Sequence, residues 1–340
     1  RGDVEIRSDD NVTVGCISAS AGEIDFDSEN VLFYGSNSTG GTIDLSADGT
    51  VTVNGDITAS AVVDNNNSEA PDGSATGGSI IIRAGENIQA QNLNVSAFNY
   101  SNDINPAIEV ASFGGTVDLI ADGSVELNDI NTSAITNDSI DSASSGGGDG
   151  GDVVNIPITP VVEIPTGPIL EVAPNPVLQD AIAGNVTINA ENDITVGDIT
   201  ASAFDPIVAI GGDVTLDSAQ QSVSVNSIDT TAEIAPPSSG VTTISSRGGD
   251  IDIDAETQII FSDNLDSSAN VLNSLFGINV NNTRGGDVEL TAESSATEIS
   301  IAGAKPSSLE ANDGGNNITY SDNGGGGGVT LKAPRDIELG

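Results

Sequence analysis

Hydrophobic and polar residues alternate along most of this chain in short runs that are separated by turn residues. In "GTIDLSADGTVTVNGDITASA", which begins at Gly41, aliphatic residues take every second position of three runs, 42–47, 50–54 and 56–61. A period of two is that of strands buried on one face. Asp-Gly and Asn-Gly pairs between the runs supply turn chemistry. No stretch sustains a helical period, so the pattern predicts an all-β protein.

The same unit recurs along the chain. It returns as "GSIIIRAGENIQAQNLNVSAF" from Gly78, "GTVDLIADGSVELNDINTSAI" from Gly115 and "GDVTLDSAQQSVSVNSIDTTA" from Gly212. The repeat glycine falls at positions 2, 22, 41, 78, 115, 151, 184, 212, 249, 286 and 327. The short steps define a unit of about 20 residues, and the commonest step, as from Gly78 to Gly115, adds an insertion after it.

A unit of three short strands cannot bury its apolar face alone, but it can do so when stacked on its neighbours. We therefore predict one right-handed parallel β-helix over residues 1–340, a solenoid of about ten coils with three short strands each and about 4.8 Å of rise per coil. A β-sandwich also has short strands and turns, but it does not explain the repeated 37-residue step from Gly41 to Gly78 and on to Gly115. Equivalent residues would stack in a ladder of Val4, Ile24, Ile43, Ile80, Val117, Val153, Val186, Val214, Ile251, Val288 and Val329. A second ladder is expected two positions further along each unit, and it includes Ile6, Phe26 and Leu45. Asn155 falls in this second ladder and interrupts its hydrophobic series.

The insertions follow the third run and are rich in Asn, Asp, Ser and Pro. They are expected to leave the coil at one corner and form a ridge of polar loops, the usual place for binding in repeat proteins; tolerated length variation is the alternative. Their ranges are 62–76, 98–113, 135–150, 204–210, 233–247 and 271–284. The proline-rich stretch 157–176, "PITPVVEIPTGPILEVAPNP", is expected to be an irregular excursion, because proline disrupts strand pairing.

The net charge of the chain limits the classes of partner that it can bind. Lys and Arg total 8 against 51 Asp and Glu, and the formal net charge is −43. Nucleic acid and anionic lipid need clustered basic residues, so both are excluded as partners. No apolar run reaches the roughly 18–20 residues needed to span a bilayer, so no membrane insertion is expected. The lack of an initiator Met and of a leader segment favours a fragment of a longer chain.

The pattern "GGDVTL…ITVGDITASA" over nearly the whole chain resembles the repeats of filamentous-haemagglutinin-type exoproteins, and it is most similar to cyanobacterial members. The resemblance implies a β-helical adhesin that an outer-membrane transporter exports by two-partner secretion to the bacterial surface. We therefore expect a structural or adhesive shaft segment of a secreted cell-surface or filament protein, not an enzyme. Its expected partners are host or neighbour-cell glycans and further copies joined end to end.

Two other functions use the same fold. A polysaccharide-active enzyme or carbohydrate-binding module would need converging Asp and Arg, since the chain has no His. Arg7 and Arg83, each at the fifth position after the repeat Gly, are the candidates for a catalytic base. They are expected three coils apart, roughly 14 Å, so no convergent cluster is predicted.

A Ca²⁺-dependent surface-layer component is the other alternative. "GGDGGD" at 147–152 matches the core of Ca²⁺-binding nonapeptide repeats, which makes Asp149 and Asp152 candidate Ca²⁺ ligands. Such sites draw ligands from tandem copies, and this motif occurs once, so a glycine loop is the competing interpretation.

The chain opens with Arg1-Gly2-Asp3, a cell-adhesion tripeptide. Its counterparts are "RGGDIDIDAE" from Arg247 and "RGGDVELTAE" from Arg284. The alignment predicts that the tripeptide is the corner and strand start of a repeat and not an adhesive loop tip.

Overall fold

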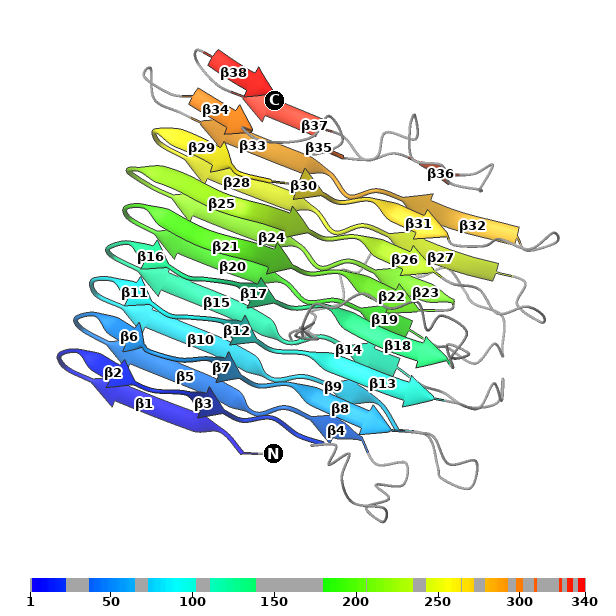
Figure 1. Cartoon of the computed structure of the whole chain (residues 1–340), viewed down its shortest axis with the longest axis horizontal. Coiled ribbons are helices and arrows are strands. Elements are labelled where there is room, and N and C mark those ends of the chain that lie inside the picture. Colours follow the sequence, from blue (N-terminus) through cyan, green and yellow to red (C-terminus); the bar gives the residue numbers. More distant parts are fainter. Residues whose placement is uncertain are drawn as a thin grey trace, which may run out of the picture.

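A computed structural model describes residues 2–22, 37–64, 73–101, 111–138, 180–205, 207–234, 243–263, 265–271, 279–292, 298–301, 309–310, 324–325, 329–332 and 336–339. All regular elements in these ranges are β-strands, which confirms the all-β prediction. The strands form four sheets, and the described strands pair in parallel. The chain visits the sheets in a fixed order and returns to the first, so each strand pairs with its counterpart one circuit later (Figure 1). The described residues contain no helix that is long and apolar enough for a membrane span.

Sheet A holds the first run of each circuit, and among the described residues it has nine strands. They are β1 (Val4–Ser8), β5 (Thr42–Ala47), β10 (Ser79–Ala84), β15 (Thr116–Ala121), β20 (Val186–Ala190), β24 (Val214–Ser218), β28 (Ile251–Ala255), β33 (Val288–Ala292) and β37 (Val329–Lys332).

The register of sheet A confirms most of the predicted ladder and corrects two of its members. β1 pairs directly with β5, and Val4 lies opposite Ile43, so Ile24 has no place between them. β15 likewise pairs directly with β20, with Val117 opposite Val186, and this removes Val153 from the ladder. The same pairings remove Phe26 and Asn155 from the second ladder. The described circuits therefore number nine and not about ten, because two of the repeat glycines do not open a circuit of their own.

Sheet B consists of two strips, one formed by the second runs and the other by the third runs. Two longer strands, β21 (Ile194–Thr200) and β25 (Ser222–Asp229), belong to both strips and join them. The first strip also contains β2 (Val12–Val14), β6 (Val51–Val53), β11 (Ile88–Gln89), β16 (Val125–Glu126), β29 (Gln258–Phe261), β34 (Glu298–Ile301) and β38 (Asp336–Leu339). The second strip contains β3 (Ile17–Ser18), β7 (Ile57–Thr58), β12 (Leu93–Asn94), β17 (Ile130–Asn131), β30 (Leu265–Asp266) and β35 (Leu309–Glu310).

The insertions are not loops throughout, and in this respect the prediction was wrong. Their first described residues form sheet C, and their last form sheet D. Sheet C consists of β8 (Ala61–Asp64), β13 (Ala97–Ser101), β18 (Ala134–Asp138), β22 (Ala203–Asp205), β26 (Ala232–Ile234) and β31 (Ala269–Val271). Sheet D consists of β4 (Ser38–Thr39), β9 (Ala75–Thr76), β14 (Ala111–Phe113), β19 (Asp180–Ile182), β23 (Val208–Ile210), β27 (Thr243–Arg247), β32 (Asn279–Arg284) and β36 (Gly324–Gly325). A circuit therefore carries more than the three predicted strands.

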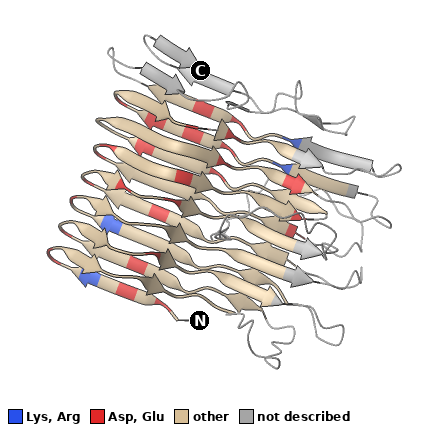
Figure 2. Cartoon of the chain, viewed as in Figure 1, with Lys and Arg blue, Asp and Glu red and all other residues tan. Residues whose placement is uncertain are grey.

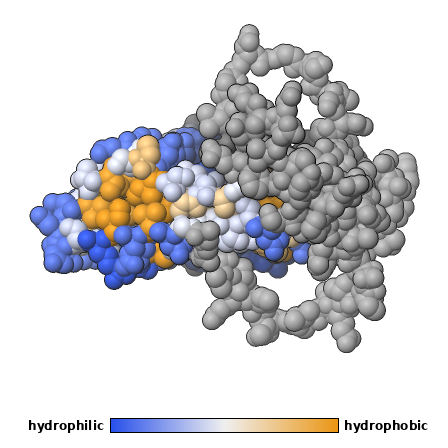
Figure 3. All heavy atoms as spheres, turned by 90° about the horizontal axis from the view of Figure 1, so that it is seen from below, coloured by the Kyte–Doolittle hydropathy of each residue, from blue (hydrophilic) through white to orange (hydrophobic). Residues whose placement is uncertain are grey.

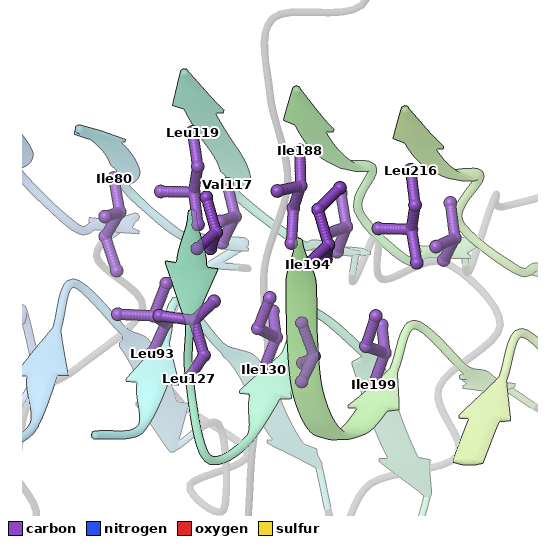
Figure 4. Packing of buried hydrophobic residues seen from close by; sticks show 14 of the residues in the cluster. Ile80, Leu93, Val117, Leu119, Leu127, Ile130, Ile188, Ile194, Ile199 and Leu216 are labelled. Atoms are coloured by element: carbon purple, nitrogen blue, oxygen red, sulfur yellow. The ribbon is translucent and has the colours of Figure 1, made fainter. Parts of the chain in front are cut away.

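Two hydrophobic clusters follow from this path, and the larger one also includes residues of sheets C and D in the early circuits, such as Ala61, Ala75 and Ala97. Sheets A and B enclose a large lobe of stacked aliphatic side chains, among them Leu119, Ile188 and Leu216 (Figure 4). Full burial of one such side chain stabilises the fold by about 1.5–3 kcal/mol. Sheets C and D enclose a small lobe that is lined mainly by alanines such as Ala134 and Ala209. Because alanine side chains are short, the two sheets of the small lobe can approach each other closely.

The repeat glycines join the two lobes at a narrow waist. The backbone N–H of Gly78 donates to the carbonyl of Ala59 at 2.8 Å, and that of Gly249 donates to Thr230 at 2.9 Å. A Cβ atom on Gly78 would lie 1.8 Å from the carbonyl oxygen of Gly41. Among the described glycines only Gly22 has a positive φ. Space at the waist, and not an unusual backbone conformation, therefore requires glycine at positions 41, 78, 212, 249 and 286.

Candidate functional site

A row of buried polar side chains crosses the small lobe. Asn99 on β13, Thr136 on β18 and Asp205 on β22 take the same inward position of sheet C in successive circuits, and Asn99 lies opposite Thr136 in the register. Ser112 on β14 faces them from sheet D. All four residues are at most 1% exposed. A hydrophobic residue, Val63, holds this position in the preceding circuit. Three successive circuits therefore place a polar residue at a core position that the preceding circuit fills with a hydrophobic one.

Hydrogen bonds tie most of this row to both sheets. The Thr136 hydroxyl donates to Ser112 Oγ at 3.0 Å, and Ser112 donates to the carbonyl of Ile135 at 3.0 Å. The Asn99 amide donates to the carbonyl of Gly73 at 2.8 Å. Buried polar groups with such partners cost little and fix the position of the strands that carry them.

Asp205 is the member of the row with unusual chemistry. Its Oδ1 accepts the backbone N–H groups of Ile207 at 2.6 Å and Val208 at 3.0 Å, which closes the short connection from β22 to β23. Its Oδ2 is buried without a hydrogen-bond partner among the described residues. Burial raises the pKa of Asp205 well above 3.8, the backbone hydrogen bonds oppose the rise, and the charge of Asp180 adds to it. The carboxyl group therefore holds its proton into less acidic solution than an exposed aspartate does.

Three other carboxyl groups share this tendency. Burial is the main cause of the raised pKa of Asp213, Asp229 and Glu233. Asp229 Oδ1 accepts the Thr231 N–H at 2.9 Å, and Asp213 Oδ1 accepts the Asp250 N–H at 2.9 Å. The Asp213 and Asp229 carboxylates thereby complete the hydrogen bonding of the backbone, and the charge of Asp229 adds to the rise in the pKa of Glu233.

The two arginines considered for catalysis are ion-paired on the outer face of sheet A (Figure 2). Only β5 separates their strands, so they lie two strand spacings apart, about 9.6 Å, and not three coils as predicted. Asp44 lies between them, 3.6 Å from Arg7 and 3.9 Å from Arg83. Arg83 also contacts Asp118 at 3.1 Å. The arrangement is a line of alternating charge, in which each guanidinium group already has a carboxylate.

The Arg-Gly-Gly-Asp segments form corner clamps. Arg247 pairs with Asp250 at 2.8 Å, and Arg284 pairs with Asp287 at 3.0 Å. Asp250 Oδ1 also accepts the N–H of Asp287 in the next circuit at 2.8 Å. Arg1 lies outside the described residues, but Asp3 accepts the N–H of Thr42 at 2.9 Å in the same way. Asp3 thus precedes a paired strand, as the alignment predicted for the opening tripeptide.

The remaining predicted features lie elsewhere. Asp149, Asp152 and the proline-rich stretch 157–176 are outside the described residues. Within the described ranges, no group of three or more His, Cys, Asp or Glu side chains is placed to hold a metal ion. Cys16 is exposed.

Comparison with known proteins found no match: no family model, no curated protein and no solved structure is similar to this chain.

Proposed function

We propose that this chain is a right-handed parallel β-helix that serves as a structural or adhesive shaft segment of a secreted bacterial cell-surface or filament protein. The observation that carries the proposal is the unbroken register of sheet A. From Val4 opposite Ile43 at one end to Leu290 opposite Leu331 at the other, each strand lies in step with the next. A continuous stack of this kind transmits force along its length, because neighbouring circuits are joined by backbone hydrogen bonds and by packed aliphatic side chains.

The surface chemistry suits such a role. A formal charge of −43 on 340 residues keeps neighbouring shafts apart in solution. Secretion, transporter-dependent export and contact with glycans remain part of the proposal through the resemblance of the repeats to filamentous-haemagglutinin-type exoproteins. In this proposal, contacts with a surface are made by the small lobe, whose sheets C and D contain the first and last described residues of the insertions.

The enzymatic alternative receives less support from the geometry. A lyase-like base needs an arginine that is directed at substrate, whereas Arg7 and Arg83 each lie against a carboxylate on a neighbouring strand. A cleavage assay on acidic polysaccharides, followed by the absorbance of unsaturated products, tests that alternative directly.

Force spectroscopy on single chains held by their two ends tests the shaft proposal. A circuit such as that from Gly41 to Gly78 contains 37 residues, so peeling it off releases about 130 Å of chain. We expect a series of rupture peaks with increments near this length. Smooth extension at low force, with no such peaks, would contradict a load-bearing role.

A further inference from the structure

The two lobes differ in the side chains that they bury. Seen from the side of β1, hydrophobic residues fill the middle of the large lobe, and hydrophilic residues lie around them (Figure 3). The small lobe instead holds the buried polar row of Asn99, Thr136, Asp205 and Ser112. Asp205 is the acidic member of this row, and its Oδ2 atom has no hydrogen-bond partner among the described residues. A buried charge without a partner is costly, so the groups around Asp205 decide whether it is ionised.

The hydroxyl groups beside Asp205 already use their protons elsewhere. A carbonyl oxygen can only accept, so the 3.0 Å bond between Ser112 and the Ile135 carbonyl uses the Ser112 proton. Ser112 Oγ must then accept from Thr136, and this second 3.0 Å bond uses the Thr136 proton. The register of β18 and β22, continued by one residue, places Thr136 next to Asp205. Thr136 therefore offers Asp205 a lone pair, which a carboxylic acid can bind and a carboxylate cannot.

The charged groups around β22 also disfavour ionisation of Asp205. The described strands packed against β22 include β18, β19, β23 and β26, and their titratable residues are Asp138, Asp180 and Glu233. Asp180 lies opposite Val208, whose N–H binds Asp205, and its charge adds to the raised pKa of Asp205. The whole segment from residue 84 to residue 246 contains no Lys, Arg or His. This part of the chain therefore supplies no basic side chain to neutralise the buried acid.

We propose that Asp205 holds a proton that completes a buried hydrogen-bond chain, from Asp205 Oδ2 through the Thr136 and Ser112 hydroxyl groups to the Ile135 carbonyl. The chain starts on sheet C, crosses to sheet D at Ser112 and returns to sheet C, so it fastens the two sheets of the small lobe together. Loss of the proton breaks the first bond, because the carboxylate then faces the Thr136 lone pair. The small lobe is thus a pH-sensitive part of the fold, fastened in acid and looser toward neutral pH. This inference goes beyond the proposed shaft function and does not depend on it.

Ser112 controls the proton of Asp205 without touching it. Burial raises the pKa of Asp205, whereas a hydrogen bond from the Thr136 hydroxyl to its carboxylate lowers it. Thr136 can make that bond only by turning away from Ser112, at a place where both residues are at most 1% exposed. One buried hydrogen bond is then lost for each one gained. As long as Ser112 holds the Thr136 proton, Asp205 is expected to keep its own.

The test compares the parent chain with Asp205→Asn, Ser112→Ala and Ser246→Ala by urea unfolding at a series of pH values. Ser246 is the matched control, because it holds the ladder position of Ser112 three circuits later. It too is buried and donates to a carbonyl of sheet C, that of Ala232 at 2.8 Å, but Ile234 stands there at the ladder position of Asp205. Each serine substitution is also made in the Asp205→Asn chain, so that the contribution of this one carboxyl group is obtained by difference. Circular dichroism establishes that every variant folds.

We expect the stability that Asp205 contributes to be lost as pH rises through its folded-state pKa, because that pKa is raised. Asp205→Asn carries a permanent donor toward Thr136, so this loss should disappear. Ser112→Ala frees the Thr136 proton to turn to the carboxylate, so the midpoint of the loss should move to lower pH. Ser246→Ala should reduce stability without moving the midpoint. At a pH where exposed carboxyl groups are ionised, the infrared C=O band of buried carboxylic acid should be weaker in Asp205→Asn than in the parent.

Three results would overturn the inference. The first is an equal midpoint in Ser112→Ala and Ser246→Ala, which would show that Ser112 has only a structural role. The second is a pH dependence of the parent that equals that of Asp205→Asn. The third is a rise in the melting temperature of the parent with millimolar CaCl₂ that Asp205→Asn lacks, which would show that a cation and not a proton neutralises the acid.

Discussion

Substitution of Gly78 by alanine tests the role of the waist. Gly78 lies where the chain passes from sheet D to sheet A, and its N–H donates to Ala59 across the waist at 2.8 Å. A Cβ atom there would lie 1.8 Å from the Gly41 carbonyl oxygen and 2.8 Å from the Ala59 Cβ, whereas ordinary contacts begin near 3.4 Å. The nearest obstacle is backbone, so no side-chain rotation can relieve the overlap. The strands must separate by more than an ångström.

The energetic cost follows from the hydrogen bonds that such a shift breaks. Separation leaves the Gly78 N–H and the Ala59 carbonyl without partners at a buried position, and each unpaired group costs about 1–3 kcal/mol. The bond from Ser79 N–H to the Gly41 carbonyl, 3.2 Å long, is strained by the same movement. Alanine recovers only about 0.4–1 kcal/mol through the lower entropy of the unfolded chain. Two unpaired groups less this recovery give an expected net loss of about 1–5 kcal/mol, to be compared with the roughly 5–15 kcal/mol that stabilises a typical domain.

Urea unfolding followed by circular dichroism measures this loss, and Gly15→Ala is the matched control. A Cβ atom on Gly15 meets nothing within 4 Å, so this variant should equal the parent or gain up to about 1 kcal/mol. A Gly78→Ala chain within about 0.5 kcal/mol of the parent, the range of ordinary surface substitutions, would refute the steric account of the waist. Hydrogen exchange at the neighbouring circuits would show whether the opening is local.

Three further predictions concern the small lobe, the large core and the outer face. The raised pKa of Asp205 means that its contribution to stability is complete below pH 3.8 and is lost as pH rises through the folded-state pKa. Asp205→Asn should therefore flatten the fall in stability toward neutral pH in urea titrations at several pH values, and a pH dependence equal to that of the parent would contradict this assignment. Ile82 is fully buried. In the same unfolding assay, its replacement by alanine should lower the free energy of unfolding by about 2–5 kcal/mol, and its replacement by valine by about 0.5–1.5 kcal/mol. Arg83→Gln should cost less than about 1 kcal/mol, because its ion pairs are solvent-exposed, and a larger loss would contradict that assignment.

The strand pattern of the large lobe could be predicted from the sequence, because two independent signals agree there. Alternation places Ile43 and Leu45 on one face, and recurrence places the same pair one circuit away at Ile80 and Ile82. The small lobe lacked the second signal. Its strands are as short as two or three residues and are rich in alanine, and the segments between them differ in length from circuit to circuit. Neither periodicity nor recurrence then distinguishes them from loops.

The spacing of the repeat glycines reflects the length of a circuit, because most of these glycines lie at the waist, a feature that only the structure reveals. Gly22 and Gly151 resemble the other repeat glycines in the sequence because the residues after them look like a first run. A circuit begins where a glycine meets a carbonyl across the waist, as Gly41 does with Ala19 at 2.7 Å. The double-glycine motif at positions such as 40–41, 77–78 and 114–115 does not mark that meeting by itself, because Gly184 opens a circuit after Ala183, whereas no circuit starts at Gly151 although Gly150 precedes it.

The buried polar row could not be predicted, because the sequence places it in a segment that was expected to be solvated. In a polar loop, Asn99 and Asp205 would be unremarkable, and in a chain with 51 acidic residues one more aspartate carries no signal. Their meaning changes once sheets C and D are known, since each then lies at a position that Val63 or Ile234 fills in other circuits. Replacement of a hydrophobic residue by a carboxylate at a core position costs stability unless hydrogen bonds and a bound proton compensate. The hydrogen bonds to Ile207 and Val208 supply part of that compensation, so the short turn from β22 to β23 and the buried acid require each other.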